Sequence, residues 1–102
     1  MTNVTILFHV SIRAERREDL VDALSVVAAL SGEEDLCLAY DIYTTDRSKT
    51  DLVVVQTWET REGYETHNRL GYVGALFDRF ENDLLEPVRR TILCPASEIA
   101  SL

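Results

Sequence analysis

Residues 36–59, with the sequence LCLAYDIYTTDRSKTDLVVVQTWE, form the centre of the predicted fold. Residues 36–45 alternate between two sets of side chains with a period of two, which is typical of a β-strand. Residues 46–51 are rich in Asp, Ser and Thr, a composition that favours a turn. Residues 52–59 are mostly apolar and β-branched and predict a second strand. The short polar turn between the two strands predicts a β-hairpin.

Further predicted elements flank this hairpin on both sides. Residues 3–12 are rich in β-branched and aromatic side chains and predict a strand. Residues 14–30 carry apolar side chains at three-four spacing, which indicates an amphipathic helix. A second helical region spans residues 60–85, and residues 88–94 predict the last strand. The order βαββαβ predicts a ferredoxin-like α+β fold, in which two helices cover one face of a four-stranded antiparallel sheet.

Single residues mark the expected ends of these elements. Gly32 follows the first helix and is expected to close it in the left-handed conformation. Thr60 is expected to cap the second helical region, Gly71 to interrupt it and Pro87 to end it. Residues 95–102 show no pattern and predict a frayed tail.

The third predicted strand is apolar on both of its faces. Leu52 and Val54 share one face, and Val53 and Val55 share the other. A sheet with helices on one side only has a polar second face in most antiparallel folds. The apolar second face therefore predicts a homodimer in which two sheets pack face to face. His9 in the first strand is expected to lie on this second face of the sheet as well, so an interface role is expected for it.

Composition and charge restrict the possible partners. The length fits one domain, and the net charge of −8 argues against nucleic acid and against anionic membrane surfaces. No apolar run approaches the roughly 20 residues of a transmembrane helix, and no signal peptide is visible, so a cytoplasmic protein is expected. Cys37 and Cys94 lack metal-ligand spacing and fall on the two predicted edge strands, which indicates free thiols. The sequence contains neither a glycine-rich phosphate-binding loop nor the nucleophile-elbow motif of hydrolases.

The segment WETREGYETH, residues 58–67, contains the candidate catalytic side chains. Trp58 ends a strand, and Tyr64 and His67 lie three residues apart on the following helix, so they share one helical face. The three side chains are expected to converge near one end of the sheet, where Trp58 supplies an apolar wall and the other two can move a proton. Each also has a structural explanation, with Trp58 as a core residue and Tyr64 with His67 as a half-buried pair.

The chain resembles the antibiotic biosynthesis monooxygenase (ABM) domain family over about residues 3–94. The resemblance rests on a pattern of the form E-x-x-G-C-L-x-Y, followed by a strand that ends in Trp and a helix with His nine residues later. The matching positions are Glu34, Cys37, Leu38, Tyr40, Trp58, Thr60, Glu62, Tyr64 and His67. The resemblance implies one ABM-like domain over residues 1–102, with a core at 3–94, that pairs as a dimeric α+β barrel.

The family resemblance also implies an activity. Similar proteins include cofactor-free oxygenases of quinols and anthrones, in which the ligand lies between the helices and the sheet. By this resemblance, Trp58 lines the pocket, Tyr64 matches a tyrosine of anthrone oxygenases, and His67 is the histidine of the family motif. The expected partners are a small aromatic substrate and dioxygen, with no cofactor and no metal.

Three positions depart from the family pattern. Leu36 replaces the glycine before the cysteine, Val54 replaces an asparagine of anthrone oxygenases, and Tyr72 replaces a second histidine. No histidine follows His67, so the axial ligand of heme-degrading relatives is absent. These departures argue against heme degradation and remove one expected hydrogen bond to the substrate.

These observations predict a set of site residues and a mechanism. His67 is the predicted base, since the ordinary pKa of histidine of about 6.5 lies near neutrality. Tyr64 and Tyr72 are expected to stabilise the developing oxyanion, with Trp58 as a wall. The predicted catalytic residues are His67, Tyr64 and Trp58, and the predicted substrate-binding residues are Phe8, Val54, Tyr72, Phe77 and Arg79.

Two other functions fit the same residues. The first is an isomerase that uses the Tyr and His side chains to enolise a small hydroxy-carbonyl compound. The second is a non-catalytic module that binds an aromatic metabolite. Oxygen uptake separates the oxygenase from both, and proton exchange into a carbonyl compound separates the isomerase from the binding module.

Overall fold

The structure, a computed structural model, describes residues 3–99. Its elements follow the predicted order, with short 3-10 helices (η) and one further helix added. In chain order they are β1 (Val4–Ser11), η1 (Ala14–Arg16), α1 (Arg17–Ser31), β2 (Cys37–Thr44), β3 (Asp51–Trp58), α2 (Arg61–Asn68), α3 (Gly71–Phe80), η2 (Glu81–Asp83), β4 (Arg89–Leu93) and α4 (Ala96–Ile99).

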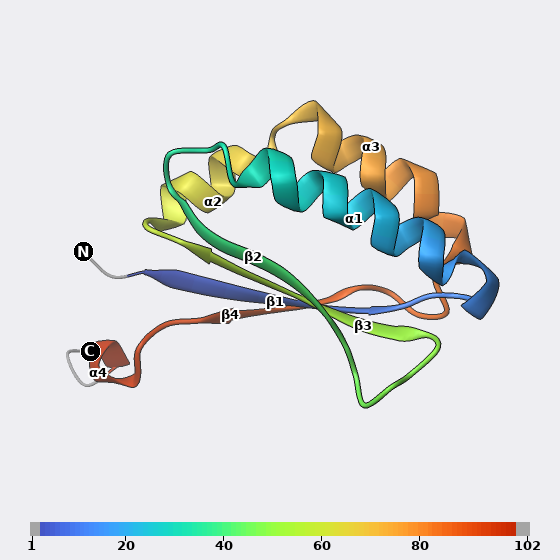
Figure 1. The fold of residues 1–102 in the computed structure, drawn as a ribbon. Helices are drawn as coiled ribbons and strands as arrows, with labels where there is room; N and C mark the ends of the chain where they lie inside the picture. Colours follow the sequence, from blue (N-terminus) through green and yellow to red (C-terminus); the bar gives the residue numbers. More distant parts are fainter. Residues whose placement is uncertain (1–2, 100–102) are drawn as a thin grey trace.

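The four strands form one antiparallel sheet in the order β2-β3-β1-β4, which leaves β2 and β4 at the edges. Helices α1, α2 and α3 all lie on one face of this sheet, as Figure 1 shows. The ferredoxin-like α+β fold predicted from the sequence is therefore confirmed. The burial of β3 alternates strictly, with Leu52, Val54, Gln56 and Trp58 turned toward the helices.

The turn between β2 and β3 explains why the hairpin closes over residues 45–50. Asp46 and Arg47 adopt left-handed backbone conformations, with φ of 40° and 61°. The hydroxyl of Ser48 accepts hydrogen bonds from the backbone N–H groups of Thr50 and Asp51, at 3.1 and 2.9 Å. These side-chain bonds replace part of the strand ladder where the chain reverses.

The helix ends agree with the sequence at one position and differ at another. Thr60 caps α2, since its hydroxyl accepts a hydrogen bond from the backbone N–H of Gly63 at 3.0 Å. The expected left-handed cap at Gly32 is wrong, because this glycine has φ of −63°. Its N–H bonds to the carbonyl of Ala28, so it continues the helical turn instead of reversing it.

The second helical region divides where the sequence predicts, next to Gly71, but it is shorter than expected. The break falls at Leu70, whose extended backbone (ψ of 140°) separates α2 from α3 just before Gly71. Regular α-helix ends at Phe80 and η2 adds a turn only as far as Asp83, so the predicted helical end at residue 85 is wrong. In the tail, residues 96–99 form the short helix α4, and residues 100–102 lie outside the described part of the chain.

The core between the helices and the sheet consists of two hydrophobic clusters. The larger joins Ile12, Leu20, Leu24, Leu52, Val54 and Phe80, and the smaller joins Val4, Ile6, Trp58 and Tyr64. Each such side chain, once buried, contributes about 1.5–3 kcal/mol to stability. The two cysteines are free. Among residues 3–99, no helix has the length and apolar character needed to cross a membrane.

Candidate active site between the helices and the sheet

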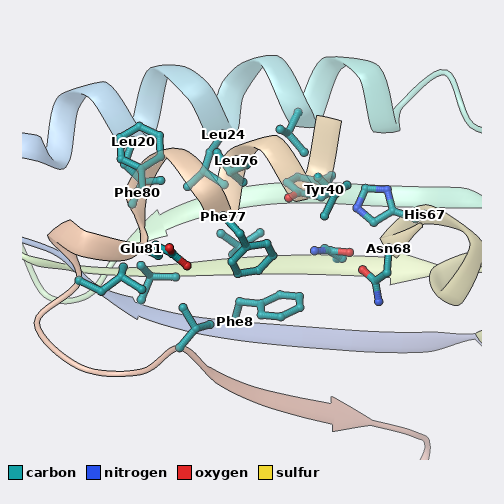
Figure 2. A pocket seen from close by; sticks show the side chains of 17 residues that line it. Phe8, Leu20, Leu24, Tyr40, His67, Asn68, Leu76, Phe77, Phe80 and Glu81 are labelled. Carbon is teal, nitrogen blue, oxygen red and sulfur yellow. The ribbon is translucent and has the colours of Figure 1, made fainter. Parts of the chain in front are cut away.

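A cavity of about 70 Å³ lies between the helices and the sheet, beside the larger core cluster. Its walls come from both layers of the fold and are mostly apolar, as Figure 2 shows. Strands β1 and β3 contribute Phe8 and Val54, and α3 contributes Leu76, Phe77 and Phe80. A concave, mostly apolar pocket with a few polar groups is the usual form of a small-molecule site.

The polar side chains of the cavity gather at one end. Figure 2 shows His67 and Asn68 at that end, with Tyr40 beside them, and Glu81 at the other end. Gln56 also lines the cavity and is almost fully buried. On the strands, Tyr40 and Gln56 are direct neighbours across the β2–β3 pair. The polar end is therefore built jointly by the sheet and by α2.

His67 is the buried titratable side chain of this end and is only 1% exposed. Its Nδ1 lies 2.9 Å from a carboxylate oxygen of Glu34, which precedes β2. The imidazole ring packs against the indole of Trp58, with ring centroids 4.7 Å apart. His67 therefore contacts the cavity on one side and a carboxylate on another, an arrangement suited to acid–base chemistry.

Tyr72 completes a three-residue cluster around Glu34. Its hydroxyl donates to the same carboxylate oxygen at 2.6 Å and lies 3.4 Å from Nδ1 of His67. Burial, together with the hydrogen bond to Glu34, raises the pKa of Tyr72 to about 12. Burial also raises the pKa of Tyr40 above its ordinary value. Both phenols therefore remain protonated near neutral pH and can act as hydrogen-bond donors.

Trp58 lies behind the cavity and is fully buried. Its indole N–H donates to Oε1 of Gln56 at 3.0 Å, so the tryptophan touches two polar residues of the cavity, Gln56 and His67. It forms part of the smaller core cluster and is not among the residues that line the cavity. Its direct neighbours are therefore side chains of the protein.

The remaining predicted residues occupy different places. Tyr64 belongs to the smaller core cluster, and its hydroxyl accepts a hydrogen bond from Arg90 at 3.2 Å. The guanidinium of Arg79 lies over the ring of Phe80, 4.7 Å from its centroid. Neither side chain lines the cavity. Of the eight predicted site residues, Phe8, Val54, His67 and Phe77 line it, and Trp58 and Tyr72 contact His67 from outside it.

Three residues of the site, Glu34, Tyr40 and Gln56, were not among the predicted site residues, although Glu34 and Tyr40 match the family pattern. For Gln56 a signal existed, because it is the one amide on the inward face of β3 among Leu52, Val54 and Trp58. Tyr40 shares that inward face through its pairing with Gln56. For Glu34 periodicity gives no signal, since it lies in a polar link outside any strand or helix.

The structure explains how the chain accommodates Leu36. This side chain packs against Gly63 of α2, where an added Cβ would lie only 2.8 Å from the Leu36 Cβ. The missing glycine before Cys37 is thus matched by a glycine on the facing helix. The contact is tight enough that a larger residue at position 63 would displace the start of β2 or the helix.

Within residues 3–99, the structure contains no group of three or more His, Cys, Asp and Glu side chains placed to hold a metal ion.

The whole chain is similar in fold to several solved structures. No curated protein matches it. Solved structures with the same fold include Rv0793 from Mycobacterium tuberculosis, 22% identical, with 91% of this chain and 94% of that chain covered and a TM-score of 0.83.

Two further solved structures share this architecture. PA3566 from Pseudomonas aeruginosa is 22% identical, with 92% of this chain and 94% of that chain covered and a TM-score of 0.81. A protein described as an antibiotic biosynthesis monooxygenase is 16% identical, with 88% and 95% covered and a TM-score of 0.81. At these identities the likeness shows the fold alone.

The family relationship comes from the sequence. The family described as antibiotic biosynthesis monooxygenase matches residues 3–79, a span that includes the cavity residues of β1, β2, β3 and α2 and most of α3. This match covers more than half of the length of the chain. The chain therefore belongs to the antibiotic biosynthesis monooxygenase family.

Proposed function

We propose that this protein is a cofactor-free monooxygenase that oxidises a quinol, an anthrone or a related aromatic small molecule with dioxygen. The observation that carries the proposal is the buried His67, which meets the apolar cavity on one side and bonds to Glu34 on another. A base in this position can deprotonate a weakly acidic aromatic hydroxyl. Membership of the monooxygenase family supports the same reaction class.

The chemistry requires a substrate that reduces dioxygen itself once it is deprotonated. In this scheme His67 takes a proton from the bound quinol, and the electron pair stays on the substrate. The substrate then supplies all the electrons that reduce dioxygen: one oxygen atom enters the aromatic ring and the other leaves as water. The product of a simple quinol is the corresponding hydroxyquinone.

The lining of the cavity favours an uncharged substrate. No lysine or arginine is among the described side chains that line it, and Glu81 lies at the end away from His67. A carboxylate or phosphate would lose its hydration there without gaining a positive partner, which is costly. Apolar walls are also compatible with dioxygen, which is itself apolar. A neutral aromatic ring with a weakly acidic group is the ligand that fits these walls.

The size of the cavity favours a single ring over several. Its volume of about 70 Å³ is about half that of the roughly 150 Å³ engineered cavity that accepts benzene. A monocyclic quinol therefore needs a modest widening, whereas a three-ring anthrone needs a larger one. Phe77 on α3 is the large apolar lining side chain best placed to move, because it is 46% exposed.

We include a homodimer and a cytoplasmic location in this proposal. The sheet face opposite the helices carries no covering element in Figure 1. Leu7, Val53 and Val55 are half-buried on it, and Tyr43 and Leu93 at the edges are exposed. The strand registers place Val53 beside Tyr43 and Val55 beside Leu7, so the apolar side chains adjoin one another. A second copy of the same face is the simplest cover for such a surface.

The experiment that tests the proposed reaction is oxygen consumption by purified, metal-free protein with a panel of substituted hydroquinones and anthrones. Autoxidation of each compound without protein sets the baseline. We expect protein-dependent uptake that falls about 10²–10⁴-fold in His67→Ala. Trp58→Phe tests the wall behind the histidine, and Glu33→Gln, an exposed neighbour of Glu34, serves as the control with unchanged uptake.

The outcomes separate the three candidate functions. Wild-type-like uptake in His67→Ala would remove the histidine from the mechanism. No uptake with any compound, together with deuterium exchange into a hydroxy-carbonyl compound, would instead favour an isomerase. Binding of the aromatic compounds with neither reaction would favour a non-catalytic binding module.

A further inference from the structure

Two residues outside the cavity lining, Glu34 and Trp58, form hydrogen bonds with residues at its polar end. Glu34 can only accept such a bond and Trp58 can only donate one, so each fixes how its partner is oriented. The first is Glu34, whose ionised carboxylate accepts hydrogen bonds and cannot donate them. It lies 2.9 Å from Nδ1 of His67, so Nδ1 carries the proton of the neutral ring. The other ring nitrogen, Nε2, then holds a lone pair and is the atom available to a ligand in the cavity.

The second one-way partner is the indole of Trp58, which donates and cannot accept. Its N–H lies 3.0 Å from the side-chain amide of Gln56, so the atom of Gln56 that faces it is the carbonyl oxygen. The amide –NH₂ group is left as the part of Gln56 available to the cavity, which this residue lines. Trp58 thus fixes the amide orientation in the way that Glu34 fixes the tautomer.

The two oriented groups are neighbours. Trp58 packs against the ring of His67, with centroids 4.7 Å apart, and bonds to Gln56. His67 and Gln56 therefore meet the same indole and line the same cavity. His67 presents an acceptor, its Nε2 atom, and Gln56 presents a donor, its amide –NH₂ group.

We propose that this pair makes the cavity selective for a neutral hydroxyl group on an aromatic ring or an enol, with Gln56 as a ligand-binding residue and Glu34 as a positioning residue. A hydroxyl donates to Nε2 of His67 and accepts from the amide of Gln56. An ether lacks the donor, and a carboxylate would face the lone pair of Nε2 with its own lone pairs. The inference rests on the proposed function, because it names the group that the same site recognises.

The arrangement also suits the removal of that hydroxyl proton. When the proton moves to Nε2, its bonding electron pair stays on the ligand oxygen, which keeps the hydrogen bond from Gln56. The imidazolium that forms faces the carboxylate of Glu34. The other titratable groups that face His67 are the phenols of Tyr72 on α3 and Tyr40 on β2, both of which are protonated near neutral pH.

The tautomer can be measured without any ligand. Nitrogen-15 NMR of the imidazole distinguishes Nδ1–H from Nε2–H, and His9→Gln leaves the signals of His67 alone, since the chain has two histidines. We expect Nδ1–H in the wild type, loss of that preference in Glu34→Ala, and no change in the control Glu33→Gln. An Nε2–H tautomer in the wild-type protein would overturn the proposal by itself, whether or not the variant folds well.

Selectivity is measured by NMR titration with 4-propylphenol and its methyl ether, 4-propylanisole. We expect the phenol to bind about tenfold more tightly or better, because the ether leaves buried polar groups unpaired. In Gln56→Met and in Glu34→Ala the ratio should fall toward one, while Glu33→Gln keeps it. Equal affinities in the wild-type protein would contradict the inference.

Neither readout depends on oxygen chemistry, so the two proposals fail separately. Phenol selectivity without oxygen uptake would leave this inference standing and remove the monooxygenase. Oxygen uptake from a substrate whose methyl ether binds equally well would do the reverse.

Discussion

Glu34 accepts hydrogen bonds from Tyr72 and His67 on a single carboxylate oxygen. Burial favours the protonated phenol of Tyr72 most strongly, and the hydrogen bond to Glu34 and the negative charge of that carboxylate add to this effect. The pKa of Tyr72 therefore rises to about 12, from the ordinary value of about 10. The stabilisation linked to this shift is present below about pH 10 and is lost as pH rises through about 12.

We expect Glu34→Gln to lower the pKa of Tyr72, because the amide carries no charge. The measurement is the ultraviolet absorbance of tyrosinate against pH, taken as the difference between each protein and its Tyr72→Phe derivative. Tyr43→Phe, at an exposed tyrosine, is the control and should leave this difference unchanged. A difference titration that is the same with Glu or Gln at position 34 would contradict the assigned role of the carboxylate.

Individual site residues were predictable where regular structure places them. Trp58 and His67 meet because a strand end and a helical face are fixed by periodicity. Phe8 and Val54 line the cavity because both face inward on neighbouring strands, where they are direct partners. Glu34 could not be placed in this way, because the path of a polar link depends on the tertiary contacts it makes. The functional roles of these residues remain predictions.

The contact between α2 and the start of β2 gives a stability prediction. In most exposed helix positions, replacing glycine by alanine stabilises by about 0.5–1 kcal/mol. At Gly63 the new Cβ would lie 2.8 Å from the Cβ of Leu36, so we expect Gly63→Ala to lower the free energy of unfolding by about 1–3 kcal/mol. Urea denaturation measures the difference.

The control for this prediction is Gly74→Ala, because nothing lies within 4 Å of a Cβ added there in α3. It should be neutral or stabilising. Gly63→Ala should also become neutral or stabilising when introduced into Leu36→Gly, since that change removes the opposing Cβ. An equally large destabilisation in both backgrounds would show that the Leu36 contact is not the cause.

Helix α3 gives a prediction about ligand size. Phe77 lines the cavity yet is 46% exposed, so its truncation enlarges the cavity without opening the buried core around Phe80. We expect Phe77→Ala to improve binding of 1-naphthol relative to phenol, measured by NMR titration. Val26→Ala, at a site on α1 that is 60% exposed and outside the cavity lining, should leave the ratio unchanged. An unchanged ratio in Phe77→Ala would mean that another wall limits the cavity.

The end of the second helical region shows where prediction of the elements failed. Gly71 was expected to interrupt the helix, and the structure indeed breaks there, with Leu70 extended. The early end of regular α-helix at Phe80 had no such signal. Asp83 accepts hydrogen bonds from Arg13 and Arg16, and these long-range contacts hold the 3-10 segment. Contacts between segments so distant in the chain lie outside any local pattern.

For the whole molecule, the uncovered sheet face gives a prediction about assembly. We expect the wild-type protein to sediment as a dimer and Leu7→Asp to sediment as a monomer, because Leu7 lies beside Val55 at the centre of that face. Val26→Asp, on the helical side, is the matched control and should remain dimeric. A monomeric wild-type protein in sedimentation equilibrium would rule out the proposed dimer.

Oxygen-18 labelling asks directly whether the cavity supports monooxygenation. The protein is incubated under labelled dioxygen with the hydroquinone that gives the fastest uptake, and the product is analysed by mass spectrometry. A cofactor-free monooxygenase places one labelled oxygen atom in each product molecule and the other in water, and His67→Ala abolishes this protein-dependent incorporation. An unlabelled quinone formed with hydrogen peroxide, or label incorporated equally in the His67→Ala variant, would contradict the proposed reaction.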